Sequence, residues 1–183
     1  MGLLSIIRKQ KVKDREIRML VLGLDSAGKT TIVRKLMGCD PTEVAPTMGF
    51  QIQTFEWKDY TINAWDIGGQ TSLRAFWANY FDKSDVVVWV VDVTSVDRLR
   101  ESYKELREKV ILQDQLSGTY FLLLINKIDM ISPKERKKSE SAVVQSLGLS
   151  EELHQDNYLV CSVSGITGEG LDKAMDWVIS KDI

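Results

Sequence analysis

Residues 23–30 read Gly23-Leu24-Asp25-Ser26-Ala27-Gly28-Lys29-Thr30 and match the pattern G-x-x-x-x-G-K-[ST] at every fixed position. The apolar run Ile17–Leu22 precedes them and reads as a buried strand, and Thr31–Met37 follows with helical spacing of its apolar residues. This order brings backbone N–H groups and a helix N-terminus onto one phosphate. We therefore predict that residues 23–30 form a phosphate loop at the start of an α/β fold.

The residues of the phosphate loop have separate expected roles. The Lys29 ammonium is expected to reach the β- and γ-phosphates, where it also stabilises charge during the reaction, and the Thr30 hydroxyl to bind Mg²⁺. A chance match in an ordinary loop is the alternative, and the strand and helix on either side argue against it. The candidate phosphate-binding residues are Gly23, Asp25, Ser26, Ala27, Gly28, Lys29, Thr30 and Thr31.

Size and charge exclude several classes of function. With 183 residues the chain suits one domain, and its net charge of −2 gives no overall field that attracts nucleic acid. Cys39 and Cys161 have no metal-ligand spacing, which is typical of a reducing compartment. His154 is the single histidine and lies in a polar stretch, so histidine-assisted nucleophilic catalysis is not expected. No apolar run approaches the ~18 residues of a membrane span. We expect a cytoplasmic protein.

Short apolar runs alternate with helical patterns along the rest of the chain. The turn at Lys58-Asp59 joins two alternating runs into a hairpin. Ser132, Pro133 and Glu135 form a good helix start, and the later apolar runs suit parallel strands covered on both faces. We predict a P-loop NTPase fold of the α/β class, with three α/β/α layers and a six-stranded, mostly parallel sheet with one antiparallel edge strand. The ligand should lie at the carboxyl ends of the strands. Strands are expected over 17–22, 50–57, 60–65, 86–91, 120–125 and 157–161, and helices over 31–37, near 97–113, over 134–147 and near 169–180.

A second motif, Asp66-Ile67-Gly68-Gly69-Gln70, ends the third predicted strand. Asp66 can hold Mg²⁺ through water, Gly69 lets a backbone N–H approach the γ-phosphate, and Gln70 can orient an attacking water. A Gly-Gly turn beside a solvated acid is the alternative. Thr47 is a candidate second hydroxyl on Mg²⁺, which would join only when a γ-phosphate is present. The metal candidates are therefore Thr30, Thr47 and Asp66, with Gln70 and Lys29 as the catalytic candidates.

Two further segments follow later strands and predict the base. In Asn126-Lys127-Ile128-Asp129 the Asp129 carboxylate can accept both N1–H and N2–H₂ of guanine, a pair that adenine does not offer. Asn126 and Lys127 would brace the loops, with the lysine stem over the base. In Val163-Ser164-Gly165 a backbone N–H could contact the guanine O6, although Gly165 could also be a simple turn.

Taken together, these residues resemble the Arf and Arf-like small GTPases along essentially the whole chain. The marks are the aspartate of the phosphate loop, the segment Pro46–Phe50, the segment Trp65–Gln70 and the run Leu73–Phe81. Residues 1–6 and 15–18 look most like the second Arf-like subgroup, whose members serve tubulin folding and microtubules. The resemblance implies the small G-protein fold, GTP or GDP with Mg²⁺ as ligands, and a slowly hydrolysing, monomeric switch.

The resemblance also implies protein partners. Phe50, Trp65 and Tyr80 match an exposed aromatic triad that contacts effectors, although bare aromatics are more often core residues. Between nucleotide states the hairpin of such proteins slides by two residues, which preserves which side chains face inward. No arginine in the phosphate loop or near Thr47 is an obvious group for stabilising γ-phosphate charge, so an activating protein is expected to supply one. An exchange factor and a tubulin-folding cofactor are further expected partners, and the microtubule role implies an association with the cytoskeleton.

The beginning of the chain departs from one family pattern. Myristoylation in the pattern M-G-x-x-x-[ST] needs Ser or Thr at position 6, where this chain has Ile6, so Gly2 is not expected to be acylated. We expect residues 1–15 to form an amphipathic helix or extension with weak membrane contact at most, and residues 16–183 to form the GTPase domain.

Two other functions compete with that of a hydrolysing switch. One is a nucleotide-locked scaffold for tubulin cofactors with little turnover, against which Gln70 and Thr47 argue. The other is a small-molecule P-loop kinase, which would need a substrate lid and no guanine motif, so Asn126–Asp129 disfavours it.

Overall fold

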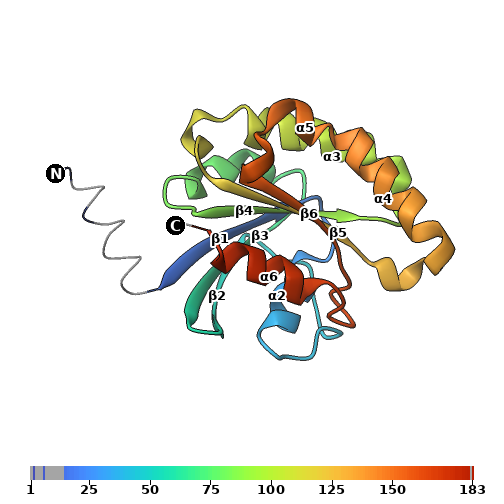
Figure 1. Ribbon diagram of the computed structural model, residues 1–183, viewed down its shortest axis with the longest axis horizontal. Helices are drawn as coiled ribbons and strands as arrows, with labels where there is room; N and C mark the ends of the chain where they lie inside the picture. The colour runs from blue at the N-terminus through green and yellow to red at the C-terminus, as the bar shows by residue number, and fades with distance from the viewer. Residues whose placement is uncertain (1, 3–5, 7–14, 182) are drawn as a thin grey trace.

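Six strands form one sheet in the order β2-β3-β1-β4-β5-β6 (Figure 1). The structure is a computed structural model that describes residues 2, 6, 15–181 and 183. Every neighbouring pair is parallel except β2 and β3, which pair antiparallel at one edge. The strands are β1 (Glu16–Gly23), β2 (Phe50–Trp57), β3 (Tyr60–Ile67), β4 (Val86–Asp92), β5 (Tyr120–Asn126) and β6 (Tyr158–Ser162).

Helices cover both faces of the sheet, with α2 and α6 on one side and α3, α4 and α5 on the other (Figure 1). Within the described residues, no helix combines the length and the apolar character needed to span a membrane. The α-helices are α2 (Lys29–Leu36), α3 (Leu99–Leu106), α4 (Pro133–Leu147), α5 (Leu149–Glu152) and α6 (Leu171–Ile179). Short 3₁₀ segments are η1 (Arg74–Tyr80), η2 (Val96–Arg98), η4 (Asp114–Leu116), η5 (Ile128–Met130) and η6 (Gln155–Asn157), and η3 (Arg107–Ile111) is a π turn.

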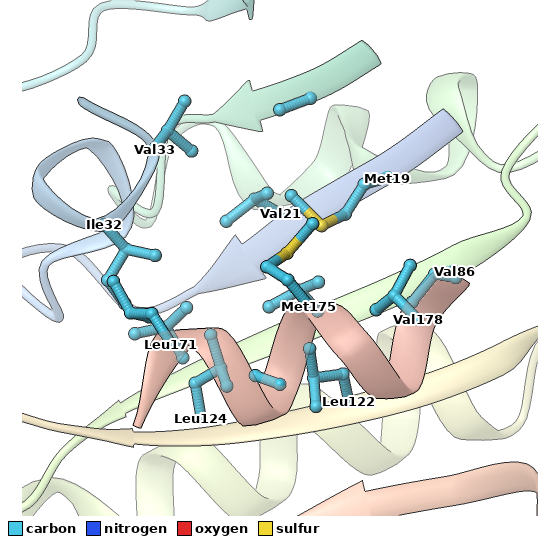
Figure 2. Close-up of a cluster of buried hydrophobic side chains, with 14 of the residues drawn as sticks. Met19, Val21, Ile32, Val33, Val86, Leu122, Leu124, Leu171, Met175 and Val178 are labelled. Carbon is cyan, nitrogen blue, oxygen red and sulfur yellow. The ribbon is translucent and has the colours of Figure 1, made fainter. Parts of the chain in front are cut away.

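The alternation of side chains along the strands creates two separate cores. On the α2/α6 side, Met175 and Val178 of α6 pack with Met19 and Val21 of β1 (Figure 2). On the other side, buried residues of η1, α3, α4 and α5 pack against the opposite face of the same strands. This two-sided burial explains why β4 and β5 read as continuous apolar runs rather than alternating ones.

The predicted architecture is confirmed: three layers, six strands and one antiparallel edge strand. The alternating run 50–57 is the pattern of a half-buried strand, and this prediction is wrong for the first half of β2. Phe50 and Ile52 are each 48% exposed, and Phe55 is the buried residue of β2. Apolar residues occupy one face at positions 50 and 52 and the other face at 55 and 57, so the first pair is left on the uncovered part of an edge strand.

Helix boundaries agree with the sequence where capping chemistry is present. α4 begins at Pro133, and the Glu135 carboxylate accepts hydrogen bonds from the N–H and the hydroxyl of Ser132 at 3.3 and 2.6 Å. The helix expected near 97–113 is instead three consecutive pieces, η2, α3 and η3. The sequence patterns do not predict η1 or α5. The amphipathic helix expected over residues 1–15 lies almost wholly outside the described residues and stays a prediction.

Candidate functional site

A cavity of about 620 Å³ opens at the carboxyl ends of the strands, where the phosphate loop joins β1 to α2. Residues from loops that are distant in sequence line it together, as expected for the ligand site of an open parallel sheet. The lining residues are Asp25, Ser26, Gly28, Lys29, Thr30, Thr31, Pro41, Thr42, Val44, Ala45, Pro46, Thr47, Gly68, Gly69, Gln70, Lys127 and Ile166. The cavity therefore brings together most of the residues that the sequence assigned to phosphate and Mg²⁺.

Lys29 is the buried cation of this cavity and is only 6% exposed. Its Nζ donates to the carbonyls of Gly23 and Leu24 at 3.0 and 2.8 Å, so the ammonium is held inside the phosphate loop. Burial lowers the pKa of Lys29 to about 8, and the nearby carboxylates of Asp66 and Asp25 oppose that shift in part. An anion in the cavity would therefore meet a buried ammonium that backbone carbonyls hold in place.

Gly28 shows why the loop requires glycine at that position. Its φ is +95°, in the left-handed region, and a Cβ there would lie 2.2 Å from Asn126 Nδ2. The amide Nδ2 of Asn126 instead donates to the Ala27 carbonyl at 2.9 Å. Ser26 also has a positive φ of 62°, and local backbone strain of this kind is concentrated at functional sites.

Three side-chain oxygens converge beside Lys29 and fit an Mg²⁺ site. Thr30 Oγ1 lies 2.7 Å from Thr47 Oγ1 and donates to Asp66 Oδ2 at 2.5 Å. Asp66 Oδ1 is buried and has no partner among the described residues, and burial raises the pKa of this carboxyl. Since no group of three His, Cys, Asp or Glu side chains converges in the described part of the chain, a cation here relies on one carboxylate, two hydroxyls and oxygens from the ligand. Mg²⁺ is commonly held in this way with substrate phosphates.

The expected base-binding segments are held against the phosphate loop by side chains. Asn126 Oδ1 accepts from the Gly165 N–H at 2.9 Å, and Lys127 Nζ donates to the Ser26 carbonyl at 2.7 Å. Asp129 Oδ1 accepts from Ser164 Oγ at 2.6 Å, which orients the carboxylate. Asn126 and Lys127 thus brace the loops as expected. The Gly165 N–H, a candidate donor to the guanine O6, instead donates to Asn126 Oδ1.

The segment Gly68–Gln70 lies directly against the phosphate loop. A Cβ on Gly69 would come within 2.3 Å of the Gly23 carbonyl oxygen, so only glycine allows this approach. Gln70 lines the cavity, and its Nε2 lies 3.9 Å from Met48 Sδ. Gly69 and Gln70 therefore line the same cavity as Lys29.

The three candidate effector aromatics form one cluster. The ring centroids of Phe50 and Trp65 are 6.1 Å apart, and Tyr80 lies 5.3 and 5.9 Å from them. The Arg18 guanidinium stacks over Trp65 at 4.8 Å from the ring centroid. Met48, Ile52 and Phe76 are exposed apolar residues, and Ile52 pairs with Trp65 across the hairpin. The cluster touches the second core but remains partly open to solvent.

Sequence reasoning missed the ion pairs that surround Asp25. Arg98 donates to the Asp25 carboxylate at 2.9 Å and Arg74 lies 3.3 Å from it, and hydrogen bonding from Arg98 lowers the pKa of Asp25. Asp92 was also missed, and it pairs with Lys127 at 2.7 Å. Arg98, Arg74 and Asp92 belong to no short motif, although Arg74 lies within the run Leu73–Phe81 that carried the resemblance.

Comparison with known proteins agrees with this geometry. Residues 3–182 match the ADP-ribosylation factor family. The chain is 41% identical over 183 residues to ADP-ribosylation factor-like protein 2 of Dictyostelium discoideum, covering 100% of this chain and 96% of that protein. It is 42% identical over 181 residues to ADP-ribosylation factor-like protein 2 of Drosophila melanogaster, covering 98% and 95%, respectively. It is also 42% identical over 178 residues to ADP-ribosylation factor-like protein alp41 of Schizosaccharomyces pombe, covering 97% and 92%.

A solved structure supports the fold independently. The Arl6 BBS3 small GTPase from Trypanosoma brucei, with the bound nucleotide analogue GppNp, superimposes with a TM-score of 0.79 at 23% identity, covering 91% of this chain and 97% of that one. The family match and the relatives of similar length extend over nearly the whole sequence. This chain therefore belongs to the ADP-ribosylation factor family, as an Arf-like small GTPase that binds GTP or GDP with Mg²⁺ and hydrolyses GTP.

Proposed function

We propose that this GTPase switches a protein-binding surface according to its nucleotide, and that a tubulin-folding cofactor is among its partners. One observation carries the first part: the metal site and the aromatic cluster share two segments of the chain. Thr47 lies three residues before Phe50, and Asp66 follows Trp65 directly. A ligand that draws Thr47 toward Thr30 and Asp66 therefore also constrains two of the three aromatic residues.

Within the site, we assign each residue a role that its contacts support. The phosphate loop binds the phosphates, with Lys29 as the buried cation, and Thr30, Thr47 and Asp66 hold Mg²⁺, which neutralises phosphate charge when bound. Asp129, oriented by Ser164, selects guanine. Gln70 orients the attacking water at the open end of the cavity.

Hydrolysis should be slow without an activating protein, because the nearby arginines are already engaged. Arg98 and Arg74 both pair with carboxylates, and Arg34 Nε donates to the Asp40 carbonyl. We expect Gln70→Leu to lower the single-turnover hydrolysis rate by roughly 100-fold with GTP affinity unchanged. A Gln70→Leu protein that hydrolyses GTP at the wild-type rate would remove the water-positioning role.

The tubulin-related part rests on the resemblance to the second Arf-like subgroup and on the similarity to relatives named ADP-ribosylation factor-like protein 2. The test is affinity capture on immobilised Gln70→Leu and Thr30→Asn proteins, the second of which is expected to bind Mg²⁺ and GTP weakly. Enrichment of a tubulin-folding cofactor on one nucleotide form over the other supports the proposal. Capture of membrane-coat proteins in place of such cofactors opposes it.

A matched pair of surface variants tests whether the aromatic cluster is the contact. Phe50→Ala should abolish capture of the cofactor, whereas Met130→Ala should leave the amount captured unchanged. Met130 is 66% exposed, but it follows β5 at a distance along the chain from the cluster. Equal loss in both variants would mean that the contact is elsewhere.

We further propose a monomeric, cytoplasmic protein that associates with the cytoskeleton through its partners. The exposed Cys39 and the buried Cys161 are both free, which is typical of a reducing compartment. A net charge of −2 does not favour a nucleic-acid partner, and we propose weak membrane contact at most. Flotation of GTP-loaded protein with vesicles tests the last point, because strong binding without an acyl chain would contradict it.

A further inference from the structure

Two buried side chains of η1 hold the backbone of the Gly68–Gln70 segment. Trp77 Nε1 donates to the Gly68 carbonyl at 3.1 Å, and Arg74 Nε donates to the Gly69 carbonyl at 2.9 Å. Trp77 is fully buried and Arg74 is 3% exposed, so water does not compete for either bond. The Asp25 N–H also donates to the Gly69 carbonyl, at 3.2 Å. Hydrogen bonds to the carbonyls of Gly68 and Gly69 therefore fix both peptide groups that flank Gly69.

Because the peptide bond is planar, these contacts also fix the direction in which the Gly69 N–H points. In a trans peptide the N–H points opposite to the carbonyl, and the structure contains no cis peptide among the described residues. Since the Gly68 carbonyl is turned into the core toward Trp77, the Gly69 N–H is turned away from the core. Within residues 15–181 it has no hydrogen-bond acceptor, and Gly69 lines the cavity. The free donor is therefore presented to the ligand.

From this geometry we propose that Trp77 and Arg74 are positioning residues that let the protein distinguish GTP from GDP. They act through the backbone, since Trp77 fixes the direction of the Gly69 N–H and Arg74 fixes the peptide that leads into Gln70. An aimed N–H favours the nucleotide that places a γ-phosphate in front of it. Neither side chain lines the cavity.

The ion pairs of Arg74 explain how a buried cation can serve this purpose. Its guanidinium pairs with Glu101 at 2.8 Å, Asp25 at 3.3 Å and Glu105 at 3.4 Å. These carboxylates come from α3 and from the phosphate loop, so the Nε that binds Gly69 is held from two sides. These ion pairs also explain why the phosphate loop tolerates an aspartate at position 25. Arg74 and Arg98 neutralise its carboxylate, which would otherwise repel a bound phosphate.

The sharpest test replaces one of two neighbouring buried tryptophans. Trp77→Phe keeps an aromatic ring and removes the indole N–H that binds Gly68. Trp89→Phe is the matched control, because Trp89 packs edge-on against Trp77 at 5.6 Å and its Nε1 donates to Ser102 Oγ at 3.1 Å. Both variants lose one buried hydrogen bond and a similar volume from the same core. Only one of the lost bonds involves the segment that faces the cavity.

The readout is the ratio of the dissociation constants for GDP and a non-hydrolysable GTP analogue, measured by fluorescence titration with Mg²⁺. We expect Trp77→Phe to weaken analogue binding relative to GDP by about three- to tenfold, the usual effect of one hydrogen bond. Trp89→Phe should keep the wild-type ratio even if its thermal stability falls equally. A wild-type ratio in both variants, or the same fall in both, would overturn the proposal.

Arg74→Lys keeps the test decisive if Trp77→Phe cannot be purified. Lysine retains the positive charge beside Asp25 and Glu101 but lacks the Nε–H that binds the Gly69 carbonyl. Its control is Arg98→Lys, since Arg98 pairs with the same Asp25 carboxylate and does not contact Gly69. We expect the ratio to fall in Arg74→Lys alone, and an equal ratio in the two variants would refute the positioning role.

Discussion

At the scale of single residues, Lys29 combines strong burial with a charge that its ligand needs. Desolvation lowers its pKa to about 8, so the ammonium is mostly charged at pH 7 and mostly neutral well above pH 8. Between pH 8 and the ordinary lysine range the unfolded chain binds more protons than the folded one. For this residue, the stability of the nucleotide-free protein therefore rises with pH through that window.

The same pKa predicts the opposite trend for nucleotide binding. Phosphate needs the charged ammonium, so binding above pH 8 must also take up a proton. We expect the affinity for GDP to be about tenfold weaker at pH 9 than at pH 7, because a group with a pKa near 8 is about one-tenth charged at pH 9. Isothermal titration calorimetry at several pH values measures both the affinity and the proton uptake.

Lys29→Arg is the control for this pH dependence. A guanidinium stays charged throughout the range, so the variant should bind more weakly overall but with a much shallower pH profile. Titration of the guanine base would act equally on both proteins. Identical profiles for the wild-type and Lys29→Arg proteins would assign the pH dependence to the ligand.

At the scale of elements, glycines lie at both ends of α2, but they are needed for different reasons. Gly28 at its start and Gly38 just beyond its end both have positive φ, 95° and 74°. A Cβ at position 28 would meet the Asn126 side chain, whereas one at position 38 has nothing within 4 Å. A side chain would therefore strain the backbone at both positions, but it would clash with a neighbouring residue only at position 28.

This difference gives a paired prediction. Gly38→Ala should cost about 1 kcal/mol of stability from left-handed strain and leave nucleotide affinity unchanged. Gly28→Ala should have the same strain and also displace Asn126 from the Ala27 carbonyl and the Gly165 N–H. We expect the affinities for GDP and GTP to fall together by more than about tenfold, as two buried hydrogen bonds are lost. Urea unfolding and nucleotide titration measure the two effects, and equal affinities in both variants would contradict the steric argument.

Elements with a strong local signal could be predicted from the sequence. Continuous apolar runs identified β4 and β5, and the Ser132 start identified α4. η1 could not, because it has no capping side chain and is held by bonds from Arg74 and Trp77 to the carbonyls of Gly69 and Gly68, which no helical periodicity records. The motifs located the residues that face the ligand, because a motif is made of residues that must contact it. They missed Arg74 and Trp77, because these side chains bind the backbone behind the motif and do not contact the ligand.

At the scale of the whole molecule, the site depends on the sheet being intact across most of its width. The phosphate loop follows β1, Asp66 belongs to β3, Asn126 ends β5 and Ser164 follows β6. These groups meet only because the parallel strands share one carboxyl edge. A ligand that contacts all of them binds the folded state and has no comparable site in the unfolded chain.

This coupling predicts that nucleotide and metal determine thermal stability together. At 100 times its dissociation constant, GDP with Mg²⁺ should add about 2.7 kcal/mol and raise the melting temperature by about 5–10 °C over protein stripped with a chelator. GTP should act alike, and ATP at the same concentration should not, because Asp129 has no matching donors on adenine. In Asp129→Ala the advantage of GTP over ATP should disappear while the fold is retained, since Asp129 is an exposed residue. If ATP stabilised the wild-type protein as much as GTP, Asp129 would not be the residue that selects the base.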